Sequence, residues 1–310
     1  MIRRLKRLAI SVLPWGLDRR FIEPHIQRAK AAFYERMAED GWLDTEVLRP
    51  EQLSALLDRD SSSGVCHIIG SGPSLLDSMT KIRPGEDRVI GFNYCALADI
   101  RFDLYLVELA TDKSNIGRRG SDIQTLIIRH ASDRIGKVGV TNLLSGKINR
   151  DYVKENYPPS TSLLYDFGIP VHLGSPYASV DRMCIRYLFA QGDDFIRKKQ
   201  TSTLTAMVIA VNAGFDRIVL HGFDFFGPHF YCDASVAWPE SIAQEDREKV
   251  IRTSLQPRIG HPARRVVPLI PHIQKHLEER HIRIFSASER SPLSRLLPVY
   301  EKRGENIAQR

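Results

Sequence analysis

The sequence predicts an α/β protein built on a mostly parallel sheet with helices on both faces. From residue 65 onward, short apolar segments alternate with segments of helical periodicity, which is the pattern of strands joined by crossover helices. Glycine-rich or polar residues directly follow several of these apolar segments. A chain of 310 residues is long enough for one large domain of this kind with added segments. In such sheets, ligands bind beyond the carboxyl ends of the strands, where these polar residues would gather.

The first 60 residues are expected to form a basic helical extension. Residues 1–30 contain eight basic and two acidic side chains, so they hold most of the net charge of +7. Apolar residues at helical spacing predict helices over 21–43 and 49–60. A basic amphipathic segment suits peripheral contact with the inner face of the cytoplasmic membrane, and packing on the protein's own core is the alternative. Because the remainder of the chain is nearly neutral, we expect no nucleic-acid partner.

The alternating part of the chain predicts a sheet domain over residues 61–224 and 262–310. Its expected strands cover 65–70, 87–93, 102–108, 125–130, 216–224 and 282–288, with a weaker one at 171–174. Its expected helices cover 264–281 and 201–215, the latter ending at Gly214 as its C-terminal cap. Residues 225–261 interrupt the alternation with aromatic residues, prolines and a charged helical segment. We expect them to form a lid or small subdomain over the site.

The four cysteines are scattered without paired spacing, so the sequence predicts neither a disulfide framework nor a zinc site. No run of 18 apolar residues is present, and we expect no transmembrane helix. A reducing cytoplasm is the compartment that fits both observations best.

The first strand ends in the turn Gly70–Ser74, with the sequence GSGPS. This turn lacks the lysine of a phosphate loop and the third glycine of the dinucleotide fingerprint. Gly70 and Gly72 nevertheless let a ligand approach the backbone closely, and the following helix would present free N–H groups to an anion. A tight strand-to-helix turn without a ligand is the alternative.

Other polar residues follow later strands or begin a helix. Asn93 suits a base or a sugar, and capping of the next helix is the alternative. Thr201, Ser202 and Thr203 begin the helix at 201–215, where they would cap it, donate to a ligand, or do both.

Candidates for the chemistry lie at and after the strand that ends at Asp224. Because Asp224 has no second aspartate beside it, we expect metal-independent chemistry in which hydrogen bonds stabilise a leaving phosphate. Tyr231 would give such a bond, or would pack in the core of the lid. His261 suits general-base work because its ordinary pKa lies near neutrality, with His221 and His229 as rivals.

Taken in order, these motifs resemble one family, the bacterial lipooligosaccharide sialyltransferases of glycosyltransferase family 42. The resemblance covers about residues 65–300 and is carried by GSGPSL, GFN, TSTLTAMVIAVNAGFDRIVLHGFDFF, Tyr231 and IGH. It implies a Rossmann-like domain of variant GT-A type, whose lid orders over a CMP-sialic acid donor. It also implies inverting transfer to a glycan or lipid-linked oligosaccharide acceptor, without a metal or other cofactor. Self-association into a homo-oligomer is left open.

The resemblance assigns roles to residues of this sequence. His261 corresponds to the general base, and Tyr231 with Arg258 would support the leaving phosphate. The positions that match donor-contacting residues of the family are Ser71, Gly72, Asn93, Thr201, Ser202 and Asp224. We expect the donor site to include also Gly70, Pro73, Ser74, Glu108, Thr203, Gly222 and Phe226.

Four positions depart from the family's pattern. Ser71 and Glu108 stand where asparagine is common, and Phe226 and Arg258 stand where tyrosine is common. A carboxylate at 108 would repel an anionic donor unless it accepts hydrogen bonds from sugar hydroxyls, while Arg258 would supply charge to the phosphate. The transferred sugar is therefore sialic acid or a related 2-keto sugar acid such as Kdo.

Two other functions fit parts of the sequence. A GSGPSL loop also occurs in proteins that resemble Mg²⁺-dependent pterin diphosphokinases, although no second acidic residue stands beside Asp224 to help hold the metal. A catalytically inactive nucleotide-binding protein of the same fold is the second alternative, favoured by Glu108 and Phe226.

Overall fold

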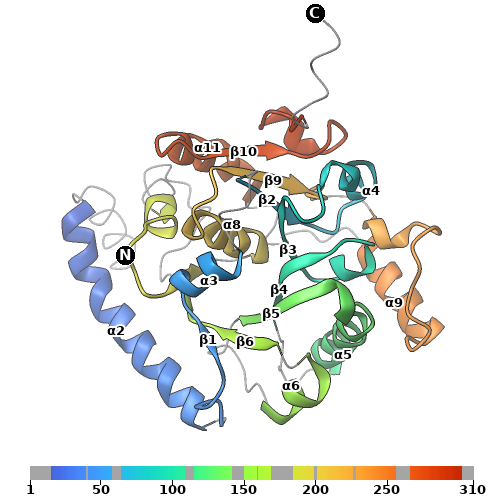
Figure 1. Ribbon diagram of the computed structural model, residues 1–310, viewed down its shortest axis with the longest axis horizontal. Helices are drawn as coiled ribbons and strands as arrows, with labels where there is room; N and C mark the ends of the chain where they lie inside the picture. The colour runs from blue at the N-terminus through green and yellow to red at the C-terminus, as the bar shows by residue number, and fades with distance from the viewer. Residues whose placement is uncertain are drawn as a thin grey trace, which may run out of the picture.

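The computed structural model describes residues 15–39, 41–57, 64–108, 115–141, 150–158, 160–168, 184–198, 201–225, 228–255 and 266–301. The predicted α/β class is confirmed: eight parallel strands form the main sheet (Figure 1). Their order is β1 (Val47–Leu48), β6 (Thr161–Leu164), β5 (Ile135–Thr141), β4 (Phe102–Glu108), β3 (Arg88–Phe92), β2 (Val65–Ile69), β9 (Arg217–His221) and β10 (Arg283–Ser286). A second, two-stranded parallel sheet contains β7 (Asp166–Gly168) and β8 (Ile196–Lys198).

The strand order reverses beside β2. The chain proceeds outward from β2 through β3, β4 and β5 to β6, and later returns to β9 and β10 on the other side of β2. A reversal of this kind is the topological switch point at which open parallel sheets bind their ligands. The carboxyl ends of β2 and β9 are therefore the place to look for a site.

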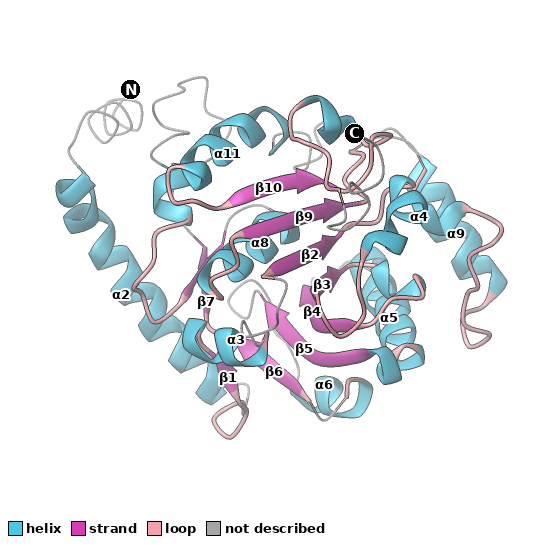
Figure 2. Cartoon of the chain, turned by 45° about the horizontal axis from the view of Figure 1, so that its top comes forward, coloured by secondary structure: helices cyan, strands magenta, loops and turns pink. Residues whose placement is uncertain are grey.

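Helices cover both faces of the main sheet (Figures 1 and 2). One face carries α4 (Ser74–Ser78), α5 (Asn115–His130) and α6 (Arg150–Asn156). Along the chain, each of these helices connects two successive strands of the series from β2 to β6. The other carries α3 (Pro50–Leu56), α8 (Ser202–Asn212) and α11 (Ile270–Glu278). Right-handed crossovers place helices on opposite faces when the chain changes direction, so this layering follows from the strand order.

Shorter and peripheral elements complete the described chain. The long α2 (Trp15–Glu39) runs along one flank beyond α3 in Figure 1, and α9 (Gln244–Leu255) lies on the flank of α5. The 3₁₀ segments are η1 (Met79–Lys81), η2 (Cys95–Leu97), η3 (Ser132–Arg134), η5 (Phe230–Cys232), η6 (Val267–Leu269) and η7 (Pro292–Arg295).

Burial explains the apolar runs in the sequence. All five residues of β2 are buried, and so are the consecutive residues Leu204–Val211 of α8, which packs between α3 and the sheet. Helix α2 buries Phe33 and Met37, and the ring of Phe33 meets that of Tyr165 edge-on at 4.9 Å. The described part of α2 therefore packs on the protein's own core.

Several predicted elements are confirmed and some are corrected. The expected strand at 125–130 is wrong, because these residues form the end of α5. Ile123, Ile127 and Ile128 are buried there at helical spacing, and the next strand is β5. A short apolar run fits a strand or one face of a helix equally well when only its own residues are considered. The expected strand at 171–174 lies outside the described residues, and β1, β5, β6, β7 and β8 were not predicted.

Candidate functional site

Two loops meet at the carboxyl ends of β2 and β9. The amide of Gly70 donates to the carbonyl of His221 over 2.7 Å, and the amide of Gly72 donates to the carbonyl of Gly222 over 2.7 Å. A Cβ on Gly70 would lie 2.6 Å from the Gly222 carbonyl oxygen, and Gly222 has a φ of +64°. Glycine at these two positions therefore lets the loops touch.

Asp224 braces the turn from the β9 side. Asp224 is only 6% exposed, and its Oδ2 accepts a hydrogen bond from the Ser74 amide over 2.8 Å. A Cβ on Gly72 would overlap Oδ2, so the carboxylate fills the space that this glycine leaves. Within the described ranges, Asp224 Oδ1 and Ser74 Oγ are buried without a hydrogen-bond partner. Because an unpaired buried polar atom costs about 1–3 kcal/mol, a hydrogen-bond partner that reached these two atoms would stabilise the turn.

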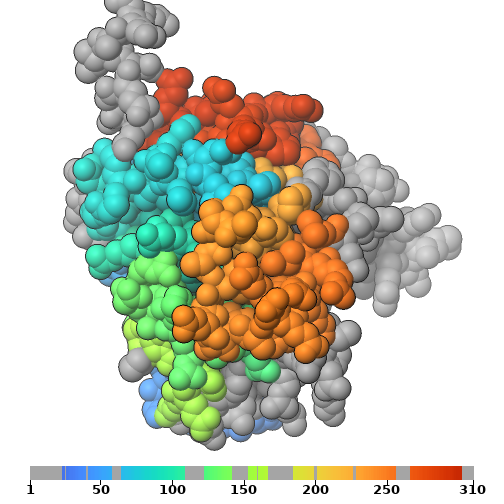
Figure 3. Space-filling view, turned by 90° about the vertical axis from the view of Figure 1, so that its right-hand side faces the viewer, coloured from blue at the N-terminus to red at the C-terminus, as the bar shows by residue number. Residues whose placement is uncertain are grey.

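The lid segment is joined to the same turn. The Phe230 amide donates to the Ser71 carbonyl over 2.9 Å, and Ser71 Oγ lies 3.1 Å from His229 Nδ1. Pro73 forms the N-cap of the five-residue α4 directly behind this contact. In Figure 3 the orange surface of residues 228–255 lies beside the cyan surface of the chain around α4 and the green surface of the chain around α5. The segment expected to form the lid is therefore joined to the glycine turn through Ser71.

Tyr231 lies at the centre of an aromatic cluster in the lid. It is 3% exposed, and its ring meets Tyr94 edge-on at 5.4 Å and Trp238 at 5.8 Å. The His229 ring stacks on it at 5.0 Å, and Trp238 Nε1 donates to its carbonyl. Tyr231 is thus packed in the core of the lid, which is one of its two expected roles. Its ring contacts Tyr94, the residue that follows Asn93.

Asn93 directly follows β3 and has a left-handed backbone conformation, with a φ of 58°. Its carbonyl accepts hydrogen bonds from Tyr105 Oη over 2.6 Å and from Gln124 Nε2 over 3.1 Å, which fix the turn. Its side chain is exposed at the carboxyl edge of the sheet. The capping alternative is not seen, because the following 3₁₀ segment has Tyr94 as its N-cap.

The first residues of α8 lie near the end of β4. Thr201 is the N-cap, and its Oγ1 accepts from the Leu204 amide over 3.3 Å, so the expected capping role is confirmed. Ser202 Oγ lies 3.5 Å from Glu108 Oε2, and Thr203 is half-buried in the first turn. The structure therefore brings Glu108 and Ser202 together, although the sequence placed them on unconnected motifs.

A lysine that sequence reasoning missed completes this cluster. Lys198, the last residue of β8, is buried, and its Nζ lies 3.0 Å from Thr141 Oγ1 and 3.4 Å from Glu108 Oε1. Asp166 Oδ2 is 3.9 Å from the same ammonium. The signal available in the sequence was the basic tract RKK shortly before Thr201.

Three candidate residues lie outside the described residues: Phe226, Arg258 and His261. Their expected roles stay predictions. Within the described ranges, no group of three or more His, Cys, Asp or Glu side chains is arranged to hold a metal ion. All four cysteines are free thiols, and burial raises the pKa of the Cys95 thiol to about 12.

A buried polar chain runs beneath the site. Asp87 Oδ2 lies 3.1 Å from His67 Nε2, His67 Nδ1 lies 2.7 Å from His221 Nε2, and His221 Nδ1 lies 3.0 Å from Ser78 Oγ. Burial holds the pKa of both imidazoles below the usual value. Burial alone would raise the pKa of the Asp87 carboxyl, but hydrogen bonds from His67 and Arg83 hold it well below its usual range. His221 is fully enclosed, which removes it as a rival general base.

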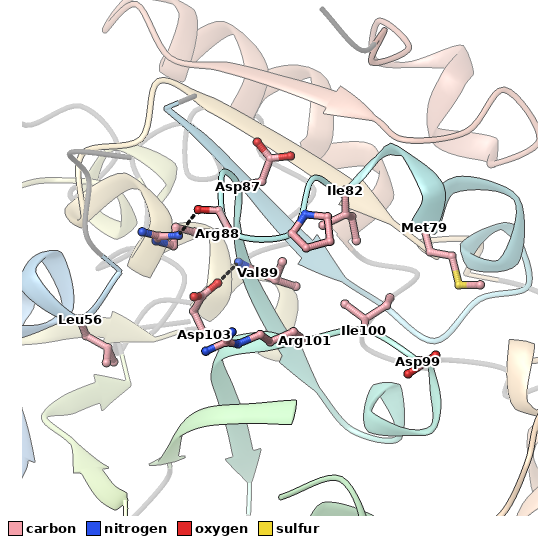
Figure 4. A pocket seen from close by; sticks show the side chains of 12 residues that line it. Leu56, Met79, Ile82, Asp87, Arg88, Val89, Asp99, Ile100, Arg101 and Asp103 are labelled. Carbon is pink, nitrogen blue, oxygen red and sulfur yellow. Dashed lines mark hydrogen bonds between the residues drawn. The ribbon is translucent and has the colours of Figure 1, made fainter. Parts of the chain in front are cut away.

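A hollow in the described chain lies elsewhere (Figure 4). It has a volume of about 340 Å³ and is lined by residues at the amino-terminal ends of β3 and β4, including Arg88, Asp99, Arg101 and Asp103. The Asp103 carboxylate accepts from the Val89 amide over 2.8 Å. None of the candidate site residues lines this hollow, because parallel strands put their amino and carboxyl ends at opposite edges of the sheet.

Comparisons with known proteins give similarity of structure only. No protein-family model and no curated protein sequence matches the chain. A similar solved structure is the monofunctional α-2,3-sialyltransferase Cst-I of Campylobacter jejuni, with 17% identity and a TM-score of 0.44 over 77% of this chain and 81% of that one.

Two structures of the Campylobacter jejuni sialyltransferase CstII are also similar. The complex with CMP-3FNeuAc has 14% identity and a TM-score of 0.43 over 76% of this chain and 86% of that one. The structure of CST-II with a trisaccharide acceptor and CMP has 15% identity and a TM-score of 0.41 over 77% of this chain and 86% of that one. Similarity at this level does not transfer an activity. None of the described helices is both long and apolar enough to cross a membrane.

Proposed function

We propose that this protein is a glycosyltransferase that moves sialic acid or a related 2-keto sugar acid from a CMP donor to a cell-surface glycan. The observation that carries the proposal is the glycine turn at the switch point, closed by Asp224 and joined to the segment expected to form the lid. Asp224 Oδ1 and Ser74 Oγ are buried there without a partner among the described residues, and hydroxyl or amino groups of a nucleotide would pair with them.

The proposed reaction needs a base, an acceptor and a stabilised leaving group. The acceptor hydroxyl gives its proton to the imidazole of His261 while its oxygen attacks the anomeric carbon of the sugar. The bond from that carbon to the phosphate oxygen breaks, and CMP leaves with the electron pair. Attack from the side opposite the phosphate inverts the anomeric centre. Tyr231 and Arg258 are proposed to support the leaving phosphate without a metal ion.

The proposal is tested by measuring CMP release from CMP-sialic acid and CMP-Kdo with a panel of glycan acceptors. His261→Ala is expected to lower transfer by about 10²–10⁴-fold, the usual contribution of a general base, while CMP binding stays the same. His130→Ala, at an exposed position on α5, is the matched control and should keep full activity.

Three outcomes would overturn the proposal or its base. Turnover of ATP that depends on Mg²⁺, without release of CMP, would point to a diphosphokinase. CMP binding without turnover over the whole acceptor panel would point to an inactive binding protein. Full transfer activity in His261→Ala would remove His261 from the role of base.

A further inference from the structure

A buried ammonium group lies beside Glu108 at the carboxyl end of β4. The side chain of Lys198 is only 8% exposed, and its Nζ contacts Thr141 Oγ1 at 3.0 Å and Glu108 Oε1 at 3.4 Å. Asp166 Oδ2 lies 3.9 Å away on the other side. One cation therefore faces two carboxylates, and these four residues come from the ends of β4, β5 and β8 and the start of β7.

The two carboxylates differ in their access to solvent. The side chain of Asp166 is 3% exposed, whereas that of Glu108 is 43% exposed at the carboxyl end of β4. Ser202 Oγ, in the first turn of α8, lies 3.5 Å from Glu108 Oε2. Asp166 is thus enclosed beside the lysine, and Glu108 presents its carboxylate to whatever occupies the edge of the sheet.

Glu108 lies within reach of a ligand bound at the switch point. Phe92 pairs with Leu106 across β3 and β4, so Asn93 and Glu108 lie at neighbouring strand ends. Two strand spacings of about 4.8 Å separate β4 from β2, which gives about 10 Å between Glu108 and the glycine turn. A nucleotide joined to a nine-carbon sugar spans that distance.

We propose that Lys198 and Glu108 together select the sugar of the donor. This inference rests on the proposed function. Lys198 offsets one of the two negative charges at the edge of the sheet, which reduces the repulsion of a donor with a phosphate and a carboxylate. The Glu108 carboxylate accepts hydrogen bonds from hydroxyl groups of the sugar, a role that suits a group with about four acceptor positions. An asparagine at position 108 would accept hydrogen bonds from the sugar without adding a charge. Here Glu108 accepts them, and Lys198 offsets the charge of its carboxylate.

The test is a double-mutant cycle measured by isothermal titration calorimetry. The proteins are the wild type, Lys198→Met, Glu108→Gln and the double variant, and the ligands are cytidine, CMP and the 3-fluoro analogue of CMP-sialic acid. Lys137→Met is the matched control, because Lys137 pairs with Glu46 away from the site. It should leave all three affinities unchanged.

Lys198→Met leaves two carboxylates unbalanced, so it should weaken both anionic ligands by at least about tenfold and leave the neutral cytidine within about twofold. Adding Glu108→Gln should restore most of the loss, because it removes the exposed negative charge. Glu108→Gln alone should keep or strengthen CMP binding but reduce the preference for the sugar analogue over CMP, because an amide accepts fewer hydrogen bonds from hydroxyls.

The inference is overturned if the double variant binds no better than Lys198→Met, or if cytidine loses as much affinity as CMP. If Lys198→Met does not fold, the test is the affinity of Glu108→Gln for the sugar analogue relative to CMP. An unchanged ratio of these two affinities overturns the inference. Failure of the proposed function looks different, because the wild type would then bind neither CMP nor its sugar analogue, or would bind them and release no CMP in the transfer assay.

Discussion

At the scale of single residues, the site depends on one glycine and one carboxylate that share a confined space. Asp224 Oδ2 occupies the position that a Cβ on Gly72 would need, and the same oxygen holds the Ser74 amide. The turn and the end of β9 are therefore fixed relative to each other before any ligand binds. A preorganised loop of this kind reduces the ordering cost of binding.

Gly72→Ala should lower the free energy of unfolding by about 1–3 kcal/mol or more and abolish CMP binding, because the added methyl group displaces Asp224. Gly85→Ala is the comparison: its Cβ would meet nothing within 4 Å, and only its φ of +82° carries a cost, about 1–2 kcal/mol. Urea denaturation and calorimetry with CMP measure the two effects. Gly72→Ala with normal CMP binding would contradict this description of the turn.

The sequence identified residues better than it identified their contacts. The sequence predicted Gly70–Ser74, Asn93, Thr201 and Asp224 because they stand at strand ends and helix starts, which a local pattern can mark. Lys198 could not, because its importance arises from β8, a three-residue strand in a separate sheet that places the ammonium beside Glu108. Contacts between segments 90 residues apart in the chain have no local signal.

At the scale of elements, the lid is joined to the site by aromatic packing and by the backbone of Ser71. The Phe230 amide donates to the Ser71 carbonyl, and the Tyr231 ring meets Tyr94 and Trp238 edge-on. Edge-to-face pairs of this kind contribute about 0.5–1.5 kcal/mol each beyond the area that they bury. The lid segment is therefore positioned by rings, and we expect the Tyr231 hydroxyl to make the proposed contact with phosphate.

Tyr231→Phe should keep these ring contacts and the melting temperature, while lowering kcat of transfer by about 10²–10³-fold, the usual effect of removing one donor to a developing charge. Tyr34→Phe, at a position 46% exposed on α2, is the control and should transfer normally. Steady-state kinetics with a CMP-sugar donor separates kcat from KM. An unchanged kcat would mean that Tyr231 only packs.

Element prediction succeeded where a continuous apolar run marks a strand and failed where the run is very short or interrupted, as in β1 and in β5, whose sequence IGKVGVT contains two glycines and a lysine. β2, β3, β4, β9 and β10 were predicted because continuous apolar runs and turn residues mark them. β1 has two residues and pairs with β6 only after the chain has folded back from α6, so tertiary pairing rather than local pattern defines it. The end of α5 was wrongly predicted as a strand because its buried isoleucines form a short, continuous apolar run.

At the scale of the whole molecule, stability depends on the buried chain from Asp87 through His67 and His221 to Ser78. Burial lowers the pKa of both histidines below the ordinary value of 6.5. Just below pH 6.5, the two imidazoles therefore stay neutral in the folded protein, whereas they take up protons in the unfolded chain. Their contribution is fully present above pH 6.5 and is lost as the pH falls below it. Each histidine adds a slope of up to about 1.4 kcal/mol per pH unit in that range.

Urea denaturation between pH 8 and pH 5 should therefore show a falling free energy of unfolding below pH 6.5. In the variant His67→Gln/His221→Gln the slope should be shallower, although the stability at pH 8 is lower because buried hydrogen bonds are lost. His130→Gln is the exposed control and should retain the wild-type slope. An identical slope in all three proteins would show that the buried pair does not govern the acid response.

The central claim, that the switch-point site binds a CMP-linked sugar acid, is tested most directly by a thermal-shift screen of the full chain. The ligands are CMP, CMP-sialic acid, CMP-Kdo, UDP and ATP with Mg²⁺. A ligand present at 100 times its Kd stabilises the folded state by about 2.7 kcal/mol and raises the melting temperature. We expect CMP and at least one CMP-sugar to raise it in the wild type and not in Gly72→Ala, and UDP and ATP to leave it unchanged. A rise with ATP and Mg²⁺ but none with any cytidine nucleotide would contradict the claim.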